Sequence, residues 1–106
     1  MRVVSGDDEW LRELVLSVGG LVEAPSRYKD DLAYWVEGRE IAHLEADDVL
    51  DLRLTRALIR ELGDDPRVER RGSSDWATLT VSPESPEDEE FVREMVAAAV
   101  QANTAA

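Results

Sequence analysis

The sequence predicts an α+β fold: a mostly antiparallel sheet of four to six strands, with two longer helices and one short helix packed mainly on one face. Two observations predict these elements: apolar residues recur at helical spacing in three segments, and six shorter segments have the pattern of strands. A third observation predicts their arrangement. Strands and helices do not alternate steadily along the chain, as the crossovers of a parallel sheet would require.

The helices are expected over about residues 7–18, from 55 or 56 to 62, and over about 86–102. Gly19 and Gly63 follow the first two apolar stripes and are typical of helix C-termini. The last helix has a well-formed start. Ser85 is a good N-cap, and Pro86 suits the first helical position because its missing N–H would have no partner there in any case.

The strands are expected at residues 20–24, 32–37, 40–46, 49–54, 67–70 and 75–81. The stretch Glu37-Gly38-Arg39-Glu40 places glycine first in a two-residue turn, which is typical of a type II′ hairpin. If Glu37 pairs with Glu40, then Tyr34 pairs with His43 and Trp35 with Ala42.

Alternation along the strands predicts two unlike faces. Leu50, Leu52 and Leu54 form an apolar side, which we expect to lie beneath the helices with Trp35 and Leu44. The other side is predicted to carry Tyr34, Val36, Ile41, His43, Asp51, Arg53, Trp76 and Thr78. That face is too apolar for a solvated surface and too charged for a buried one. It therefore predicts contact with a second copy or a ligand, unless a loop, the N-terminal helix or the first strand covers it.

The candidate catalytic residues are His43 and Asp51. A two-residue slip decides whether His43 lies opposite Asp51 or Arg53, and beside Asp51 it could act as a general base with its tautomer fixed. The alternative is a hydrogen-bonded packing histidine. No nucleophile is indicated, because Ser74 and Asp75 belong to a stretch that first suggests local turn hydrogen bonds.

A run of arginines interrupts the acidic sequence at positions 53, 56, 60, 67, 70 and 71. Arg53 and Arg67 could come together to hold a carboxylate or phosphate with paired hydrogen bonds. The alternative is that most of these arginines form surface pairs with nearby acids, each of which contributes little to stability.

Composition excludes several classes of function. The formal net charge of −12 disfavours direct binding to nucleic acid or an anionic membrane. The absence of cysteine and the single histidine exclude disulfides and sulfur- or two-histidine-based metal sites, although carboxylates could still hold an ion. We expect no cofactor and no metal. The charge indicates either a solvated surface, as in a salty cytoplasm, or an acidic decoy that occupies a basic protein.

The length of 106 residues suits a single domain, 1–106, with frayed ends at 1–6 and 103–106. No stretch has the length and hydropathy of a membrane span, and the first residues lack an apolar signal core. The sequence therefore predicts a cytoplasmic protein.

Four stretches carry a resemblance to a known family: Gly38–Leu44, Val49–Thr55, Asp65–Val68 and Ser73–Trp76. With them, residues 10 to 102 resemble the small proteins of the luciferase-domain family. The family label implies light emission, but the sequence shows no luciferin pocket or oxygen chemistry, so that activity is not carried over. The resemblance singles out His43, Asp51, Arg53, Arg67, Ser74, Asp75 and Trp76.

The leading hypothesis is a non-catalytic module whose second sheet face binds a partner, either itself as a homodimer or another protein. One alternative is a small enzyme or anionic-ligand-binding domain that uses His43 and Asp51, with Arg53 or Arg67 holding the anion. Tyr34, Ser74, Asp75 and Trp76 are the further candidate ligand-binding residues. The acidic decoy is the third hypothesis.

Overall fold

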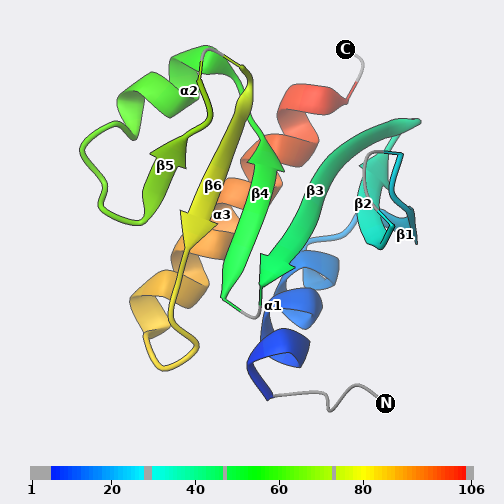
Figure 1. Ribbon diagram of the computed structural model, residues 1–106, viewed down its shortest axis with the longest axis horizontal. Helices are drawn as coiled ribbons and strands as arrows, with labels where there is room; N and C mark the ends of the chain where they lie inside the picture. Colours follow the sequence, from blue (N-terminus) through cyan, green and yellow to red (C-terminus); the bar gives the residue numbers. More distant parts are fainter. Residues whose placement is uncertain (1–5, 28–29, 47, 73, 105–106) are drawn as a thin grey trace.

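The computed structural model describes residues 6–27, 30–46, 48–72 and 74–104 and shows the predicted α+β fold (Figure 1). Its elements in chain order are α1 (Gly6–Ser17), β1 (Val22–Pro25), β2 (Leu32–Val36), β3 (Arg39–Ala46), β4 (Val49–Arg53), α2 (Arg56–Glu61), β5 (Val68–Arg70), β6 (Trp76–Thr80) and α3 (Pro86–Asn103). These bounds differ from the sequence-based ones by one or two residues, as helix and strand ends usually do.

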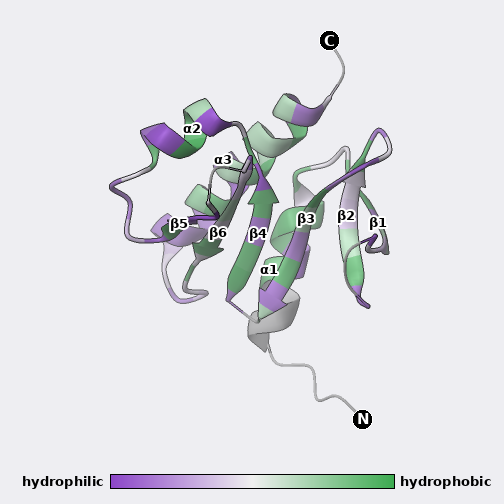
Figure 2. Ribbon diagram, turned by 45° about the horizontal axis from the view of Figure 1, so that its top comes forward, coloured by the Kyte–Doolittle hydropathy of each residue, from purple (hydrophilic) through white to green (hydrophobic). Residues whose placement is uncertain are grey.

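All six strands form one antiparallel sheet in the order β1-β2-β3-β4-β6-β5. The long helices α1 and α3 contact each other and lie behind the sheet in Figure 1, while α2 lies beside β5. Hydrophobic residues concentrate on the central strand β4 and on the inner helices, and hydrophilic ones in the peripheral connections (Figure 2). We call the side of the sheet away from α1 and α3 the open face.

The core lies between the sheet and the two long helices, where the leucine alternation placed it. Leu50 and Leu52 are fully buried, and Leu54 is nearly so. Ala77 and Leu79 of β6 pair with Leu52 and Leu50 and extend the same apolar side. On α3 the buried side chains follow the predicted stripe, Phe91, Val92, Met95, Val96 and Ala99. Burial of each large aliphatic side chain contributes about 2 kcal/mol relative to exposure.

The β2–β3 turn differs from the predicted type II′ hairpin. Val36 pairs with Arg39, so the two central residues are Glu37 and Gly38 rather than Gly38 and Arg39. Both have positive φ, 48° and 81°, which is the backbone of a type I′ turn. Glycine thus occupies the second central position. The prediction was wrong because it assigned glycine to the position that a type II′ turn requires and allowed no positive φ at a glutamate.

A β-bulge also changes the predicted pairing of β2 with β3. Tyr34 pairs with Ala42 and Trp35 with Glu40, which leaves Ile41 as an extra residue on β3. Directly paired residues share a face, so Tyr34 joins Ala42 on the helix side and Trp35 lies on the open face. The predicted faces of these two aromatic residues were therefore interchanged, because alternation read along one strand cannot register an extra residue in its neighbour.

Val36 follows Trp35 and returns to the helix side, where it is buried in the core, contrary to its predicted place on the second face. Tyr34 is buried as well. Its hydroxyl donates a 2.9 Å hydrogen bond to Glu23, whose carboxylate also pairs with Arg12 of α1. Tyr34 thus helps to fasten β1 and β2 to α1.

The end of α3 is more ordered than the sequence suggests. Asn103, expected in a frayed end, is the last helical residue and is buried. Its amide nitrogen donates to the backbone oxygens of Arg53 and Ala99, which ties the helix terminus to β4. Ser85 caps the start of α3 as predicted, accepting a hydrogen bond from the backbone N–H of Asp88. Among the described residues, no helix has the length and hydropathy needed to cross a membrane.

Candidate functional site

Strand pairing gathers the polar residues of β3, β4 and β6 on the open face. His43 pairs with Asp51, and Asp51 with Thr78, so their side chains lie in one row across three strands. In the next row Arg53 pairs with Trp76. Of the two sequence alternatives for His43, the structure therefore selects Asp51.

Asp51 is a fully buried carboxylate with three side-chain donors. It accepts from His43 Nε2 at 2.9 Å, from Arg71 Nη1 at 2.6 Å and from Thr78 Oγ1 at 2.7 Å. Burial by itself would raise the pKa of Asp51. The hydrogen bonds from His43 and Thr78 outweigh burial and lower the pKa to about 2, so the group is an anion at neutral pH.

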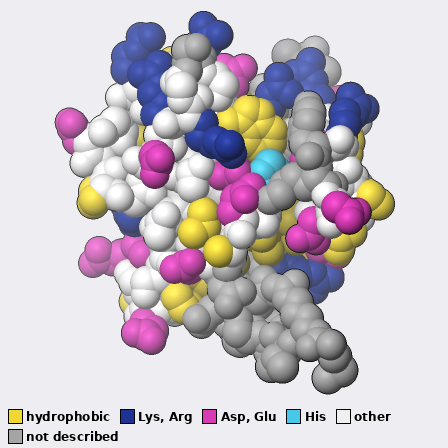
Figure 3. All heavy atoms as spheres, viewed as in Figure 1, with side chains coloured by type: hydrophobic (Ala, Val, Ile, Leu, Met, Phe, Trp, Pro, Cys, Tyr) yellow, Lys and Arg dark blue, Asp and Glu magenta, His cyan; other side chains and the backbone are white. Residues whose placement is uncertain are grey.

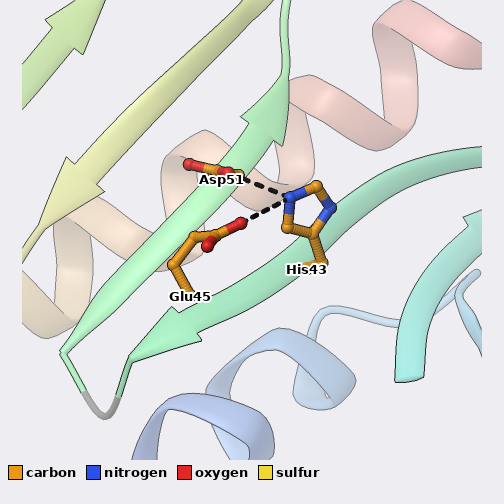
Figure 4. A group of neighbouring side chains, drawn as sticks. All are labelled: His43, Glu45 and Asp51. Atoms are coloured by element: carbon orange, nitrogen blue, oxygen red, sulfur yellow. Dashed lines mark hydrogen bonds and ion pairs between the residues drawn. The ribbon is translucent and has the colours of Figure 1, made fainter. Parts of the chain in front are cut away.

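His43 lies among three carboxylates and is only 7% exposed. Its Nε2 is 2.9 Å from Asp51 Oδ2 and also 2.9 Å from Glu45 Oε1 (Figure 4). On the other side of the ring, Nδ1 lies 3.4 Å from Glu40 Oε2. We call His43, Glu45 and Asp51 the histidine cluster. Its ligand-type atoms all lie within 4.8 Å of one another, a spacing that could hold a metal ion.

Glu40 is buried and held in place by the connection after β1. Its two carboxylate oxygens accept hydrogen bonds from Ser26 Oγ and from the backbone N–H of Arg27, both at 2.7 Å. Trp76 contacts the histidine as well, with ring centroids 5.2 Å apart and planes tilted by 33°. In Figure 3 the imidazole is visible near the middle of the open face, with acidic, basic and hydrophobic side chains around it.

A second feature of the open face is a small pocket of about 80 Å³, which we call the arginine pocket. It is lined by Arg27, Trp35, Gly38, Arg39, Glu40 and Arg53. The guanidinium of Arg27 lies 5.7 Å from the ring centroid of Trp35, a cation–π distance. Glu40 lines this pocket and also faces His43, so the arginine pocket and the histidine cluster adjoin.

Three residues that line the arginine pocket, Arg27, Arg53 and Trp35, carry side-chain donors. Within the described ranges, the guanidinium groups of Arg27 and Arg53 form no ion pair with a carboxylate. The indole N–H of Trp35 is buried and has no hydrogen-bond partner in that same part of the chain. A buried donor without a hydrogen-bond partner costs about 1–3 kcal/mol of stability, so buried N–H groups such as this indole usually have an acceptor.

Not every predicted site residue joins these two features. Tyr34 lies on the helix side. Arg67 binds Asp65 and Asp88 and stacks over Phe91 of α3 at 3.8 Å, so it does not approach Arg53 to form the predicted pair. Ser74 makes the turn contacts that its neighbours suggested, donating to the oxygen of Arg71 and accepting from the N–H of Trp76. Asp75 lies 3.7 Å from exposed Arg56.

Sequence reasoning missed the roles of Arg71, Glu40 and Trp35. Arg71 stands two residues after Glu69, which pairs with Thr78, so the parity of β5 directs it towards the open face. The alternation along β5 predicts the side of Arg71 only when the pairing of β5 with β6 is known. Glu40 is expected from sequence only as the first residue of its strand, opposite Glu37, and Trp35 as part of the core.

Comparison with known families adds one finding. The family model described as Luciferase domain matches residues 38–99, more than half of the chain. The chain belongs to the luciferase-domain family. The match covers β3 to most of α3, and therefore includes His43, Asp51, Arg71 and Trp76 of this luciferase-domain protein. No curated protein and no solved structure shows a significant match to the chain.

Proposed function

We propose that this luciferase-domain protein is a small binding module whose open face holds an anionic ligand in the arginine pocket. The observation that carries the proposal is the position of Arg27 and Arg53. The chain has 24 acidic residues against 12 basic ones, yet these two guanidinium groups face a shared pocket and have no acidic partner among the described residues. Guanidinium groups bind carboxylate and phosphate with paired, charge-assisted hydrogen bonds.

The rest of the pocket adds a third arginine, Arg39, and the ring of Trp35. Its one carboxylate, Glu40, already accepts hydrogen bonds from Ser26 and from the backbone N–H of Arg27. A volume of about 80 Å³ suits the charged group of a ligand rather than a whole cofactor. Trp76, beside Arg53, offers an aromatic surface for the rest of the molecule. We therefore propose a small metabolite with a phosphate or carboxylate group as the occupant.

The leading hypothesis from sequence, that this face binds a second copy or another protein, competes with the anion proposal. The arginines favour the small anion, because two copies meeting face to face would bring identical guanidinium groups together unless acids lay opposite them. A catalytic role for His43 has less support. Both ring nitrogens already face carboxylates, those of Asp51 and Glu45 on one side and of Glu40 on the other.

The test is titration of metal-free full-length protein with inorganic phosphate and with citrate, monitored by calorimetry and by thermal unfolding. We expect one of the two anions to bind and to raise the melting temperature. Arg53→Ala is expected to weaken that binding at least tenfold, because a charge-assisted hydrogen bond contributes about 1.5–3 kcal/mol.

The matched control is Arg60→Ala, which removes an exposed arginine of α2 outside the pocket and should leave the affinity unchanged. Equal weakening by both variants would attribute the binding to overall charge and overturn the proposal. The proposal would also be overturned if neither phosphate nor citrate bound. If light scattering instead shows a dimer that Trp76→Ser disrupts, the open face serves a second copy and the anion proposal is wrong.

A further inference from the structure

In the histidine cluster, one ring nitrogen of His43 faces two carboxylate oxygens. Nε2 of His43 can present either one hydrogen or one lone pair. Two carboxylate oxygens, from Asp51 and Glu45, nevertheless both lie 2.9 Å from it. A hydrogen on Nε2 can point well at only one of them. Three ligand-type atoms from two neighbouring strands thus converge on one point of the open face (Figure 4).

We propose that His43, Glu45 and Asp51 form a binding site for a first-row divalent transition metal such as Mn²⁺ or Zn²⁺. A cation between the three atoms would take the Nε2 lone pair and neutralise both carboxylates. With metal–ligand bonds of about 2.1 Å, ligand atoms at right angles lie about 3 Å apart, close to the two observed separations. This site is separate from the proposed anion pocket and does not depend on it.

The groups around the three ligands have the arrangement that supports metal-binding residues. A histidine bound through Nε2 usually directs Nδ1–H at a carboxylate, which fixes the tautomer and the ring orientation. Here Nδ1 faces buried Glu40 at 3.4 Å, and Glu40 is itself fixed by Ser26 and Arg27. The second oxygen of Asp51 accepts from Thr78, which orients that carboxylate too.

The cluster is open to solvent on one side, and its mixed nitrogen and oxygen ligands favour a transition metal ion. Asp51 closes the bottom of the site, while the side chain of Glu45 is 34% exposed and leaves a path from solvent. Imidazole nitrogen suits Mn²⁺, Zn²⁺ and similar ions, whereas Mg²⁺ and Ca²⁺ prefer sites made only of oxygen. Three protein ligands leave further coordination positions for water.

Arg71 competes for the site. Its Nη1 lies 2.6 Å from the same Asp51 oxygen that faces His43, and it supplies positive charge where the metal would. The Arg71 side chain is 52% exposed, so it can move away from Asp51 into solvent without leaving its own charge buried. If the cluster is a metal site, removing Arg71 tightens metal binding. If the cluster is only an ion-pair network, removing Arg71 produces no affinity for the metal.

The experiment titrates metal-free, untagged full-length protein with ZnCl₂ and MnCl₂ and follows the imidazole protons of His43 by NMR. The chain has a single histidine, so these signals report on this site alone. We expect Zn²⁺ to shift them until one equivalent is bound, and substoichiometric Mn²⁺ to broaden them. MgCl₂ should bind at least tenfold more weakly.

Substitutions separate this site from binding to a generally acidic surface. Asp51→Asn and Glu45→Gln should each weaken Zn²⁺ binding at least tenfold, and Arg71→Ala should strengthen it. Glu45→Gln removes a partly exposed group, so it keeps the test decisive if Asp51→Asn fails to fold. Asp75→Asn is the matched control and should change nothing. Unshifted His43 signals at millimolar Zn²⁺, or equal weakening by Asp75→Asn, would overturn the proposal.

Discussion

His43 and Asp51 show how far the chemistry of one residue depends on its neighbours. The same aspartate on an exposed strand would be an ordinary surface acid. Here it is fully buried, and hydrogen bonds from His43 and Thr78 keep it ionised despite its burial. Such perturbed groups are common at functional sites and also in structural ion-pair networks. Titration with Zn²⁺ distinguishes these two cases for the histidine cluster.

The ion pair between Arg67 and Asp65 predicts that stability depends on pH. Nε and Nη2 of Arg67 donate to the two oxygens of Asp65, and these hydrogen bonds hold the pKa of Asp65 below its ordinary value. A carboxyl whose pKa is lower in the folded state stabilises the fold above its unfolded pKa of about 3.9. That contribution disappears as the pH falls from there through the folded pKa.

We therefore expect Asp65→Asn to destabilise the protein at pH 7 and to have a smaller effect at pH 3. Urea denaturation of both proteins at pH 7, 4 and 3 measures the difference in the free energy of unfolding. Glu69→Gln, on an exposed residue of β5, serves as the control and should give a small difference at all three values. A difference for Asp65→Asn that grows towards low pH would contradict the assigned role.

Among the elements, the β2–β3 hairpin determines which side chains reach the site. Its two-residue turn and the bulge at Ile41 together bring Glu40 beneath His43 and place Trp35 on the open face. An extra residue in one strand twists the pair and redirects the side chains beyond it. With the same turn and no bulge, Tyr34 would lie opposite Ile41 and share the face of His43, and Trp35 would lie on the helix side, away from the arginine pocket.

The turn itself predicts a stabilising substitution. Glu37 has φ of 48°, a conformation that costs energy for most side chains and is accepted by asparagine, and Gly38 follows it. Glu37→Asn creates the Asn-Gly pair preferred in type I′ turns and should stabilise the fold by about 0.5–1 kcal/mol. Thermal unfolding measures the gain. Glu37→Gln removes the same charge without easing the backbone, so an equal gain from it would refute the explanation.

At the scale of the whole molecule, charge is the dominant feature. A net charge of −12 on 106 residues produces self-repulsion in the folded state, which added salt screens. Raising NaCl from about 0.05 M to about 0.5 M, which shortens the screening length several-fold, should therefore raise the melting temperature.

Glu90 and Glu94 provide the comparison, because both are exposed on α3. Replacing both by glutamine should reduce the response of the melting temperature to salt. A melting temperature that falls with NaCl would show instead that attractive surface pairs, such as the one between Arg12 and Glu23, outweigh the repulsion. The titrations with phosphate and Zn²⁺ need constant ionic strength, so that this general effect is not counted as binding.

The sequence alone determined which segments become helices and strands, and which side of the central strands is buried. Both follow from short-range periodicity: Leu50, Leu52 and Leu54 must share a side, and burial of that side against α3 fixes the opposite one, with His43, Asp51 and Trp76. The family resemblance was likewise present in local stretches of sequence, and the family match confirms it.

The composition of the candidate sites depends on contacts between segments that lie far apart in the sequence. Arg71 reaches Asp51 from beyond β5 across β6, and Arg27, in the connection between β1 and β2, lines one pocket with Trp35 and Arg53. These contacts depend on which strands pair and on one extra residue at a bulge. No periodic pattern within a single segment carries that information, because it arises from the balance of packing and hydrogen bonding over the whole sheet.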